Sequence, residues 1–227
     1  MTGSNLGPPE RRTGRLIAFE GGEGAGKSSQ IALLARTIRG LGRTVVVSHE
    51  PGATPLGRQI RGLVLDSDGQ ISPRAEALLF AADRAQHVAT VIRPALERGE
   101  VVITDRFVDS SLAYQGAGRT LALDDVKRLS RWATEELVPD LTVLLDVPAD
   151  VGLARVRRRQ AGTGAGSGLD RVEREALEFH DRVRAGFRSL AESEPSRYLM
   201  LDATGTVDEL AGAISAQVQA MLGIRPA

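Results

Sequence analysis

The feature that most constrains the fold is a short glycine-rich stretch near the N-terminus. Residues 21–28 read GGEGAGKS and fit the pattern G-x-x-x-x-G-K-[ST]. The apolar run 16–19 precedes the stretch, and residues 27–40 follow it with apolar side chains at helical spacing. A strand, a glycine loop and a helix in this order present backbone N–H groups and a helix dipole to a phosphate chain. The stretch therefore predicts a nucleoside triphosphate site.

Two side chains of this loop have direct roles in the predicted chemistry. Lys27 would place its charge between the β- and γ-phosphates, and the Ser28 hydroxyl would bind Mg²⁺. The alternative is a glycine-rich turn with an exposed lysine, which is disfavoured because Lys27 and Lys127 are the only lysines in the chain. We expect triphosphate contacts at Gly21, Gly22, Glu23, Gly24, Ala25, Gly26, Lys27, Ser28 and Ser29.

Short apolar runs alternate with helix-like segments along the rest of the chain. Strands are predicted at 44–48, 101–104, 141–147 and 197–203, and helices at 56–65, 73–98, 124–137, 150–159, 171–191 and 207–222. Asp124 is a candidate helix cap. Because the strands are apolar without alternation, we expect them to be buried on both faces of a parallel sheet. The prediction is an α/β fold of about five parallel strands flanked by helices, forming one domain over 15–227 after a flexible tail over 1–14.

Composition excludes several classes of protein. The 29 basic residues balance 29 acidic ones, so bulk charge predicts neither a DNA-coating nor a membrane-surface protein. There is no Cys and there are three His, which excludes a disulfide framework and disfavours a zinc site. We find no apolar run of about 18 residues and no signal peptide, so a cytoplasmic location is expected.

The loop alone does not say what is done with the triphosphate, but the other residues narrow the choice. The only Asn is Asn5, so the Asn-Lys-x-Asp element by which switch GTPases read guanine is missing. Several Arg lie close to predicted strand ends, as expected for clamping a second phosphorylated substrate. Two alternatives stay open: another P-loop kinase of small metabolites, and an ATP-binding regulatory protein with a disabled acceptor site.

A set of motifs over residues 15–222 resembles the thymidylate kinase family, in its bacterial form with lid arginines. The motifs are FEGGEGAGKSSQ (19–30), HEPGATPLG (49–57), LLFAADRAQH (78–87), VVITDRFVDSSLAYQGAGR (101–119), PDLTVLLDV (139–147), RVRRR…GLDRVE (155–173) and LDATGTVDEL (201–210). The resemblance implies a P-loop kinase fold and Mg²⁺-dependent transfer of the ATP γ-phosphoryl group to dTMP, giving dTDP and ADP for dTTP synthesis. It also implies a homodimer, with no nucleic acid or membrane partner.

The resemblance assigns catalytic and metal-binding roles. Asp105 and Arg106 close a predicted strand, where Ser28 and Asp105 would hold the metal and Arg106 would reach the transferring phosphoryl group. A plain strand-end salt bridge is the alternative for this pair. The expected catalytic set is Lys27, Arg106, Arg159 and Glu23.

The dTMP contacts implied by the family are Glu23, Arg61, Phe80, Arg84, Arg106, Ser111, Tyr114 and Gln115. Glu23 would accept a hydrogen bond from the sugar 3′-hydroxyl, and Tyr114 would lie under the sugar. Phe80 and Arg84 share one helix face, so Phe80 could stack on thymine while Arg84 donates to a base carbonyl. On helix pattern alone a core Phe80 is the stronger interpretation; the family match favours stacking.

Arginines on both sides of the Gly-rich segment AGTGAGSG (161–168) resemble a lid over about 155–171. They are Arg155, Arg157, Arg158, Arg159 and Arg171. A mobile segment that bears Arg can close on the triphosphate and exclude water. We expect Arg159 to be catalytic and Arg157 to contact ATP, while Thr204 would lie near adenine. His49 stands where the family commonly has Arg, and we assign it no catalytic role.

Overall fold

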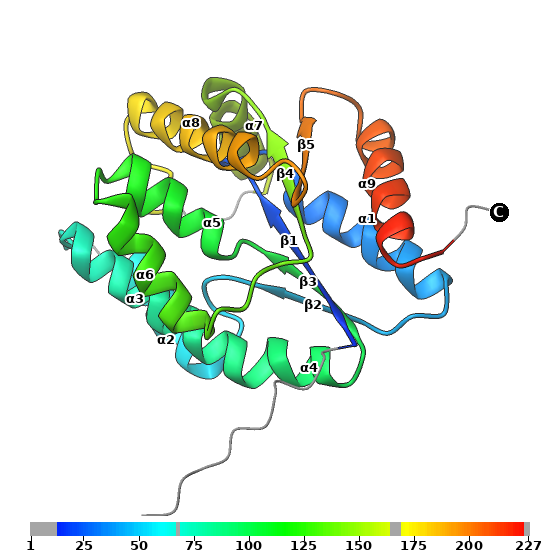
Figure 1. Ribbon diagram of the computed structural model, residues 1–227. Coiled ribbons are helices and arrows are strands. Elements are labelled where there is room, and N and C mark those ends of the chain that lie inside the picture. The colour runs from blue at the N-terminus through cyan, green and yellow to red at the C-terminus, as the bar shows by residue number, and fades with distance from the viewer. Residues whose placement is uncertain (1–12, 67–68, 164–168, 225–227) are drawn as a thin grey trace, which may run out of the picture.

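The structure is a computed structural model that describes residues 13–66, 69–163 and 169–224. Its centre is a parallel sheet with helices on both faces (Figure 1). The strands lie in the order β2-β3-β1-β4-β5. Their bounds are β1 Arg15–Glu20, β2 Val45–His49, β3 Val101–Asp105, β4 Leu141–Asp146 and β5 Tyr198–Asp202. The predicted five-stranded α/β fold is confirmed, whereas most of the predicted tail lies outside the described residues.

The helices follow the predicted order along the chain. Their bounds are α1 Lys27–Gly40, α2 Pro55–Leu65, α3 Pro73–His87, α4 Arg93–Glu97, α5 Val108–Ser111, α6 Leu123–Thr134, α7 Ala149–Thr163, α8 Leu177–Ser193 and α9 Val207–Met221. Two π-helical segments, Val88–Ile92 and Leu112–Gly118, continue α3 into α4 and extend α5. No helix of the described chain is long and apolar enough to cross a membrane.

Alternate side chains of β1 enter cores on opposite faces of the sheet. Ile17 and Phe19 join the cluster that α1 and α9 complete, whereas Leu16 and Ala18 join the cluster under α4. All four are fully buried, and each large aliphatic or aromatic one contributes about 1.5–3 kcal/mol through burial. Burial on both faces is thus confirmed for the central strands.

The edge strands depart from that expectation. Val47 of β2 and Met200 of β5 are 46% and 43% exposed, since each edge strand has a neighbour on one side only.

Three local predictions were wrong. Asp124 does not cap α6: the cap residue is Ala122, and Asp124 lies in the first turn, where a carboxylate still complements the helix dipole. The helix predicted over 150–159 continues to Thr163, into the segment predicted as a loop. The helix predicted from 171 begins only at Leu177, because Asp170 Oδ1 accepts hydrogen bonds from the N–H groups of Val172 and Glu173 and forms a turn instead.

The carboxyl ends of the strands bring the polar residues together. Parallel pairing places Asp105 beside both Phe19 and His49. In the sheet, β2 and β3 lie on one side of β1, and β4 and β5 lie on the other. The connection from β1 runs to β2, whereas the connection from β3 crosses β1 to reach β4, so the loop after β1 lies where the strand order reverses. Ligands of open α/β sheets bind at such a point.

Candidate active site

The phosphate loop after β1 is held by close backbone contacts. Gly21 and Gly24 have φ values of +137° and +67°, in the left-handed region that glycine tolerates. A Cβ on Gly24 would overlap the carbonyl oxygen of Gly152 in α7, and one on Gly21 would overlap that of Leu145 in β4. The glycines therefore permit both the turn and its seat between β4 and α7.

Lys27 is the first residue of α1 and its side chain folds back over the loop. Nζ donates to the carbonyls of Gly21 and Gly22 at 3.0 and 3.2 Å. Burial, with nearby Arg106, lowers the pKa of Lys27, while Asp105 and Glu23 oppose the shift. The exposed-lysine alternative is wrong, since Lys27 is 8% exposed.

Ser28 and Asp105 lie next to each other at the strand ends. The Ser28 hydroxyl is 3.4 Å from Asp105 Oδ2. The described residues contain no cluster of three or more His, Cys, Asp or Glu that could hold a metal. A hydroxyl and one carboxylate instead fit Mg²⁺, which usually takes one or two protein oxygens and completes its shell with phosphates and water.

Arg106 joins the phosphate loop to the neighbouring cavity. Its φ is +72°, strained for a non-glycine residue, and its N–H donates to Phe19 O at 2.9 Å. The guanidinium donates to Glu23 at 2.6 Å and to the hydroxyl of Tyr114 at 3.1 Å. Arg106 thus makes an ion pair, but with the loop acid Glu23 rather than at its own strand end.

Glu23 is the shared acceptor of this cluster. The Tyr114 hydroxyl donates to it at 2.7 Å. Burial would raise the pKa of Glu23, but Arg106, Lys27 and Tyr114 outweigh it and lower the pKa to about 2. The side chain is therefore an anion at neutral pH and accepts hydrogen bonds.

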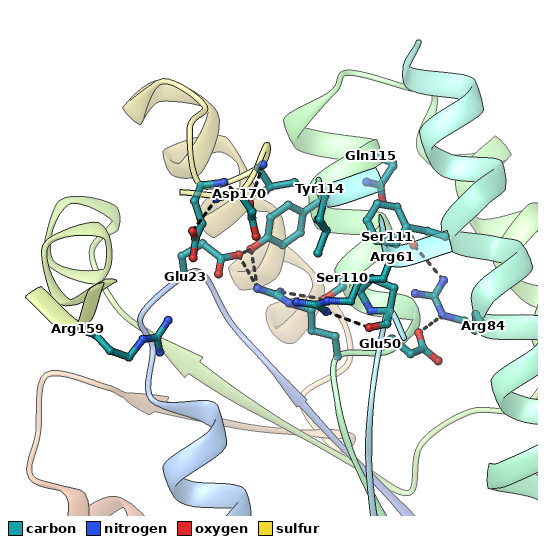
Figure 2. A pocket seen from close by; sticks show the side chains of 16 residues that line it. Glu23, Glu50, Arg61, Arg84, Ser110, Ser111, Tyr114, Gln115, Arg159 and Asp170 are labelled. Atoms are coloured by element: carbon teal, nitrogen blue, oxygen red, sulfur yellow. Dashed lines mark hydrogen bonds and ion pairs between the residues drawn. The ribbon is translucent and has the colours of Figure 1, made fainter. Parts of the chain in front are cut away.

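One cavity brings the predicted second-substrate residues together (Figure 2). Its lining includes Glu23, Arg61, Phe80, Arg84, Arg106, Ser111, Tyr114, Gln115 and Arg159. Glu23 and Arg159 lie at the end toward the phosphate loop, and Arg84, Ser111 and Gln115 lie at the opposite end (Figure 2). Phe80 is half-buried against the cluster that includes Tyr114 and also lines the cavity, so both of its predicted environments are present. Arg61 lines the wall and donates to Pro51 O at 3.0 Å.

A buried carboxylate that the sequence did not reveal lies behind Arg84. Glu50 accepts from Arg84 Nε at 2.8 Å and lies 2.9 Å from His87 Nδ1, and His87 Nε2 is 2.6 Å from the Ser48 hydroxyl. Burial would raise the pKa of Glu50, but Arg84 and His87 outweigh it and hold it below its ordinary value. No local signal marks it, because Glu50 follows the polar residues Ser48 and His49 and its partner Arg84 is 34 residues away.

Glu20 was also missed. It is fully buried at the end of β1 and accepts from the N–H of Phe107 at 2.8 Å and from the Ser110 hydroxyl at 2.6 Å. Burial, followed by nearby Asp109, raises its pKa to about 7. The Ser110 hydroxyl also accepts from Arg106, so Glu20 braces the turn from which Arg106 projects.

The lid arginines differ in what they contact. Arg157, Arg158 and Arg159 are all exposed, and of these three Arg159 alone lines the cavity. Arg155 donates to the carbonyl of Ala203 at 3.0 Å and is 3.4 Å from that of Gly24. Arg171 lies outside the cavity lining and donates to Glu76 and to the carbonyl of Val64.

Thr204, predicted near adenine, and His49, to which no catalytic role was assigned, both lie outside the cavity lining. The backbone N–H and hydroxyl of Thr204 both donate to Asp202 Oδ1, at 2.9 and 2.7 Å. Burial, with nearby Arg61, lowers the pKa of His49, which favours the neutral ring.

A phosphate loop that faces an arginine-lined cavity across the edge of a parallel sheet defines a P-loop kinase with a second small phosphorylated substrate. Comparison with known proteins gives the particular family: a family model described as thymidylate kinase matches residues 19–214. The chain belongs to the thymidylate kinase family.

Individual relatives cover nearly the whole chain. A thymidylate kinase of Leifsonia xyli subsp. xyli is 57% identical over 206 residues, covering 91% of this chain and 95% of that protein. A thymidylate kinase of Clavibacter michiganensis subsp. michiganensis is 52% identical, with 92% and 97% covered. One of Deinococcus radiodurans is 50% identical, with 90% and 96% covered.

Proposed function

We propose that this protein transfers the γ-phosphoryl group of ATP to dTMP, giving dTDP and ADP, a step toward dTTP. The observation that supports this most directly is the single cavity that all the predicted dTMP residues line, with Arg106 and Glu23 between it and the phosphate loop. Two nucleotides can thereby meet phosphate to phosphate.

The transfer needs alignment and charge neutralisation rather than a covalent intermediate. An oxygen of the acceptor phosphate attacks the γ-phosphorus in line. Lys27, Arg106 and Arg159 neutralise the charge of the migrating group, and Arg61 holds the acceptor phosphate. Ser28 and Asp105, 3.4 Å apart, would hold Mg²⁺, which would supply positive charge to offset that of the phosphates.

The sugar and base contacts follow from the lining of the cavity. Glu23, ionised and already an acceptor, takes the sugar 3′-hydroxyl, and the ring of Tyr114 lies under the sugar. Phe80 stacks on thymine, while Arg84, Ser111 and Gln115 meet its polar edge.

The remaining parts of the site complete the donor side. The segment 155–171 acts as the lid, with Arg157 on ATP and Thr204 beside adenine. The phosphate contacts are those of residues 21–29. The cytoplasm, which supplies ATP and free nucleotides, is the compartment that this reaction requires.

A homodimer is part of the proposal. Leu63, Leu78 and Trp132 are 56%, 58% and 82% exposed. They lie on α2, α3 and α6, which pack side by side (Figure 1). Large apolar side chains gathered on neighbouring elements are typical of a protein interface.

A coupled assay of ADP formation with dTMP, dUMP, dCMP, AMP and GMP tests the function. We expect dTMP to give the highest kcat/KM. Equal or better turnover of dCMP, AMP or GMP would contradict the thymidylate assignment and indicate a kinase for another nucleotide. Normal ATP binding without transfer to any monophosphate would indicate a non-catalytic ATP-binding protein.

A further inference from the structure

The orientation of the Gln115 amide is determined by a buried carboxylate outside the cavity lining. Gln115 Nε2 donates to Glu76 Oε1 at 2.8 Å, and Glu76 is 1% exposed. Burial would raise the pKa of Glu76, but hydrogen bonds from Gln115, Arg171 and Arg119 outweigh it and lower the pKa. An ionised carboxylate only accepts, so the NH₂ of Gln115 must face Glu76.

This leaves the carbonyl oxygen of Gln115 for a ligand. Within the described part of the chain, nothing donates to Gln115 Oε1, and Gln115 lines the cavity. The cavity therefore has a hydrogen-bond acceptor at this position.

Arg84, by contrast, can offer the cavity only hydrogen-bond donors. Its guanidinium donates to Glu50 Oε2, to the Ser111 hydroxyl and to the carbonyl of Phe107 at 2.8–2.9 Å. Arginine has five N–H groups and no acceptor, so any N–H that reaches the cavity is a donor.

The hydrogen bond from Arg84 leaves the Ser111 hydroxyl to act as a donor toward the cavity. Because its oxygen accepts from Arg84 Nη1, its own proton is left for another acceptor. Arg84, Ser111 and Gln115 lie together at one end of the cavity (Figure 2). That end therefore presents two donors next to one acceptor.

We infer that Glu50 and Glu76 are positioning residues that make this end of the cavity select a pyrimidine with a 4-keto group and an N3–H. The inference rests on the proposed function and explains its base selectivity. Thymine and uracil offer an acceptor at O4 and a donor at N3, whereas cytosine offers a donor at N4 and an acceptor at N3. Polar groups that are left unpaired in a buried site discriminate far more strongly than missing apolar contacts.

The variant Glu76→Gln tests the inference. An amide at position 76 can donate or accept, so the Gln115 amide is free to reverse and to offer its NH₂ to cytosine N3. We expect the ratio of kcat/KM for dTMP to that for dCMP to fall at least tenfold. The ratio of dTMP to dUMP, which share the same polar edge, should stay within twofold. A merely structural role for Glu76 would lower all three activities together.

Arg119→Gln is the matched control. Arg119 is another partner of Glu76, at 3.2 Å, and its loss leaves the carboxylate and so the Gln115 orientation in place. The dTMP to dCMP ratio should therefore not change in this variant. Glu50→Gln, which loosens Arg84, should also lower that ratio. An unchanged ratio in folded Glu76→Gln and Glu50→Gln proteins would overturn the inference.

A measurement on the unaltered protein covers the case in which these variants do not fold. 5-Methyl-dCMP keeps the size of thymine but has a donor at N4 and an acceptor at N3, so we expect at least a tenfold loss of affinity relative to dTMP by calorimetry. Equal binding of the two would overturn the inference while leaving the proposed function intact. Failure of the protein to bind dTMP at all would instead contradict the proposed function.

Discussion

Arg106 is the residue at which the two halves of the site meet. Its positive φ turns the chain back over the phosphate loop, where it donates to the carbonyl of Gly21 as well as to Glu23 and Tyr114. The strain of this backbone conformation is offset by bonds from neighbouring residues, among them Thr104 Oγ1 to Arg106 O at 2.9 Å. One guanidinium is thus held at the boundary between donor and acceptor.

Phe80 provides a test of base stacking at the residue scale. Phe80→Ala should raise KM for dTMP on the order of tenfold and leave KM for ATP nearly unchanged, since stacking of a base on an aromatic ring contributes about 1–3 kcal/mol. Steady-state kinetics with each substrate varied in turn measure both values. Leu79→Ala is the control, because Leu79 packs against the same cluster without lining the cavity. Equal rises in both KM values would make Phe80 a core residue only.

Glu20 gives a prediction about pH and stability. The unfolded carboxyl ionises near 4.5 and the folded one near 7, so the folded state keeps its proton longer. The free energy of unfolding should therefore fall as pH rises between these values, by up to roughly 3 kcal/mol. Glu20→Gln removes this titration, so its stability relative to the unaltered protein should increase from pH 5 to pH 8. Urea denaturation at each pH gives the free energy of unfolding of both proteins. A difference between the two free energies that stays constant from pH 5 to pH 8 would contradict the raised pKa.

At the scale of elements, the periodicity of apolar residues predicted the helices and strands that depend on contiguous sequence. The strands, α1 and the phosphate loop depend on contiguous residues, and their bounds agree with the prediction to within a residue or two. The start of α8 was wrong because one side chain, Asp170, competes with the helix for backbone N–H groups. Val172, which precedes α8, is buried all the same. The apolar pattern therefore predicted that this residue is buried, but not where the helix begins.

The lid arginines give a prediction about catalysis at the scale of the elements. Arg159 and its neighbour Arg158 are both exposed on α7, but Arg159 lines the cavity and Arg158 does not. Arg159→Ala should lower kcat on the order of a hundredfold with little change in either KM, as for contacts made mainly in the transition state. Arg158→Ala serves as the control and should leave kcat unchanged. A kcat that survives Arg159→Ala would move the role to another arginine of the segment.

For the molecule as a whole, the sequence predicted which residues line the cavity but not what holds them there. The family motifs placed Arg84 and Gln115 in the site, but their buried partners Glu50 and Glu76 lie 34 and 39 residues away in sequence. Neither hydropathy nor spacing encodes such a pairing, because each carboxylate reads locally as a surface residue. The proposed basis of base selectivity therefore became visible only in the fold.

The proposed dimer is also a property of the whole molecule. Light scattering should give a particle of twice 24.2 kDa. Leu78→Asp, in α3 between α2 and α6, should shift it toward the monomer by placing a charge in an apolar contact. Leu177→Asp, an exposed leucine on α8, is the control and should leave the dimer intact. A monomeric unaltered protein at micromolar concentration would contradict the dimer.

Phosphoryl transfer itself can be followed most directly with ATP labelled at the γ-phosphate. The purified protein is incubated with labelled ATP, Mg²⁺ and dTMP, and the nucleotides are then separated. We expect the label to appear in the β-phosphate of dTDP, in an amount equal to the ADP formed. Label found only in inorganic phosphate, or retained in ATP while dTMP stays unchanged, would contradict the account.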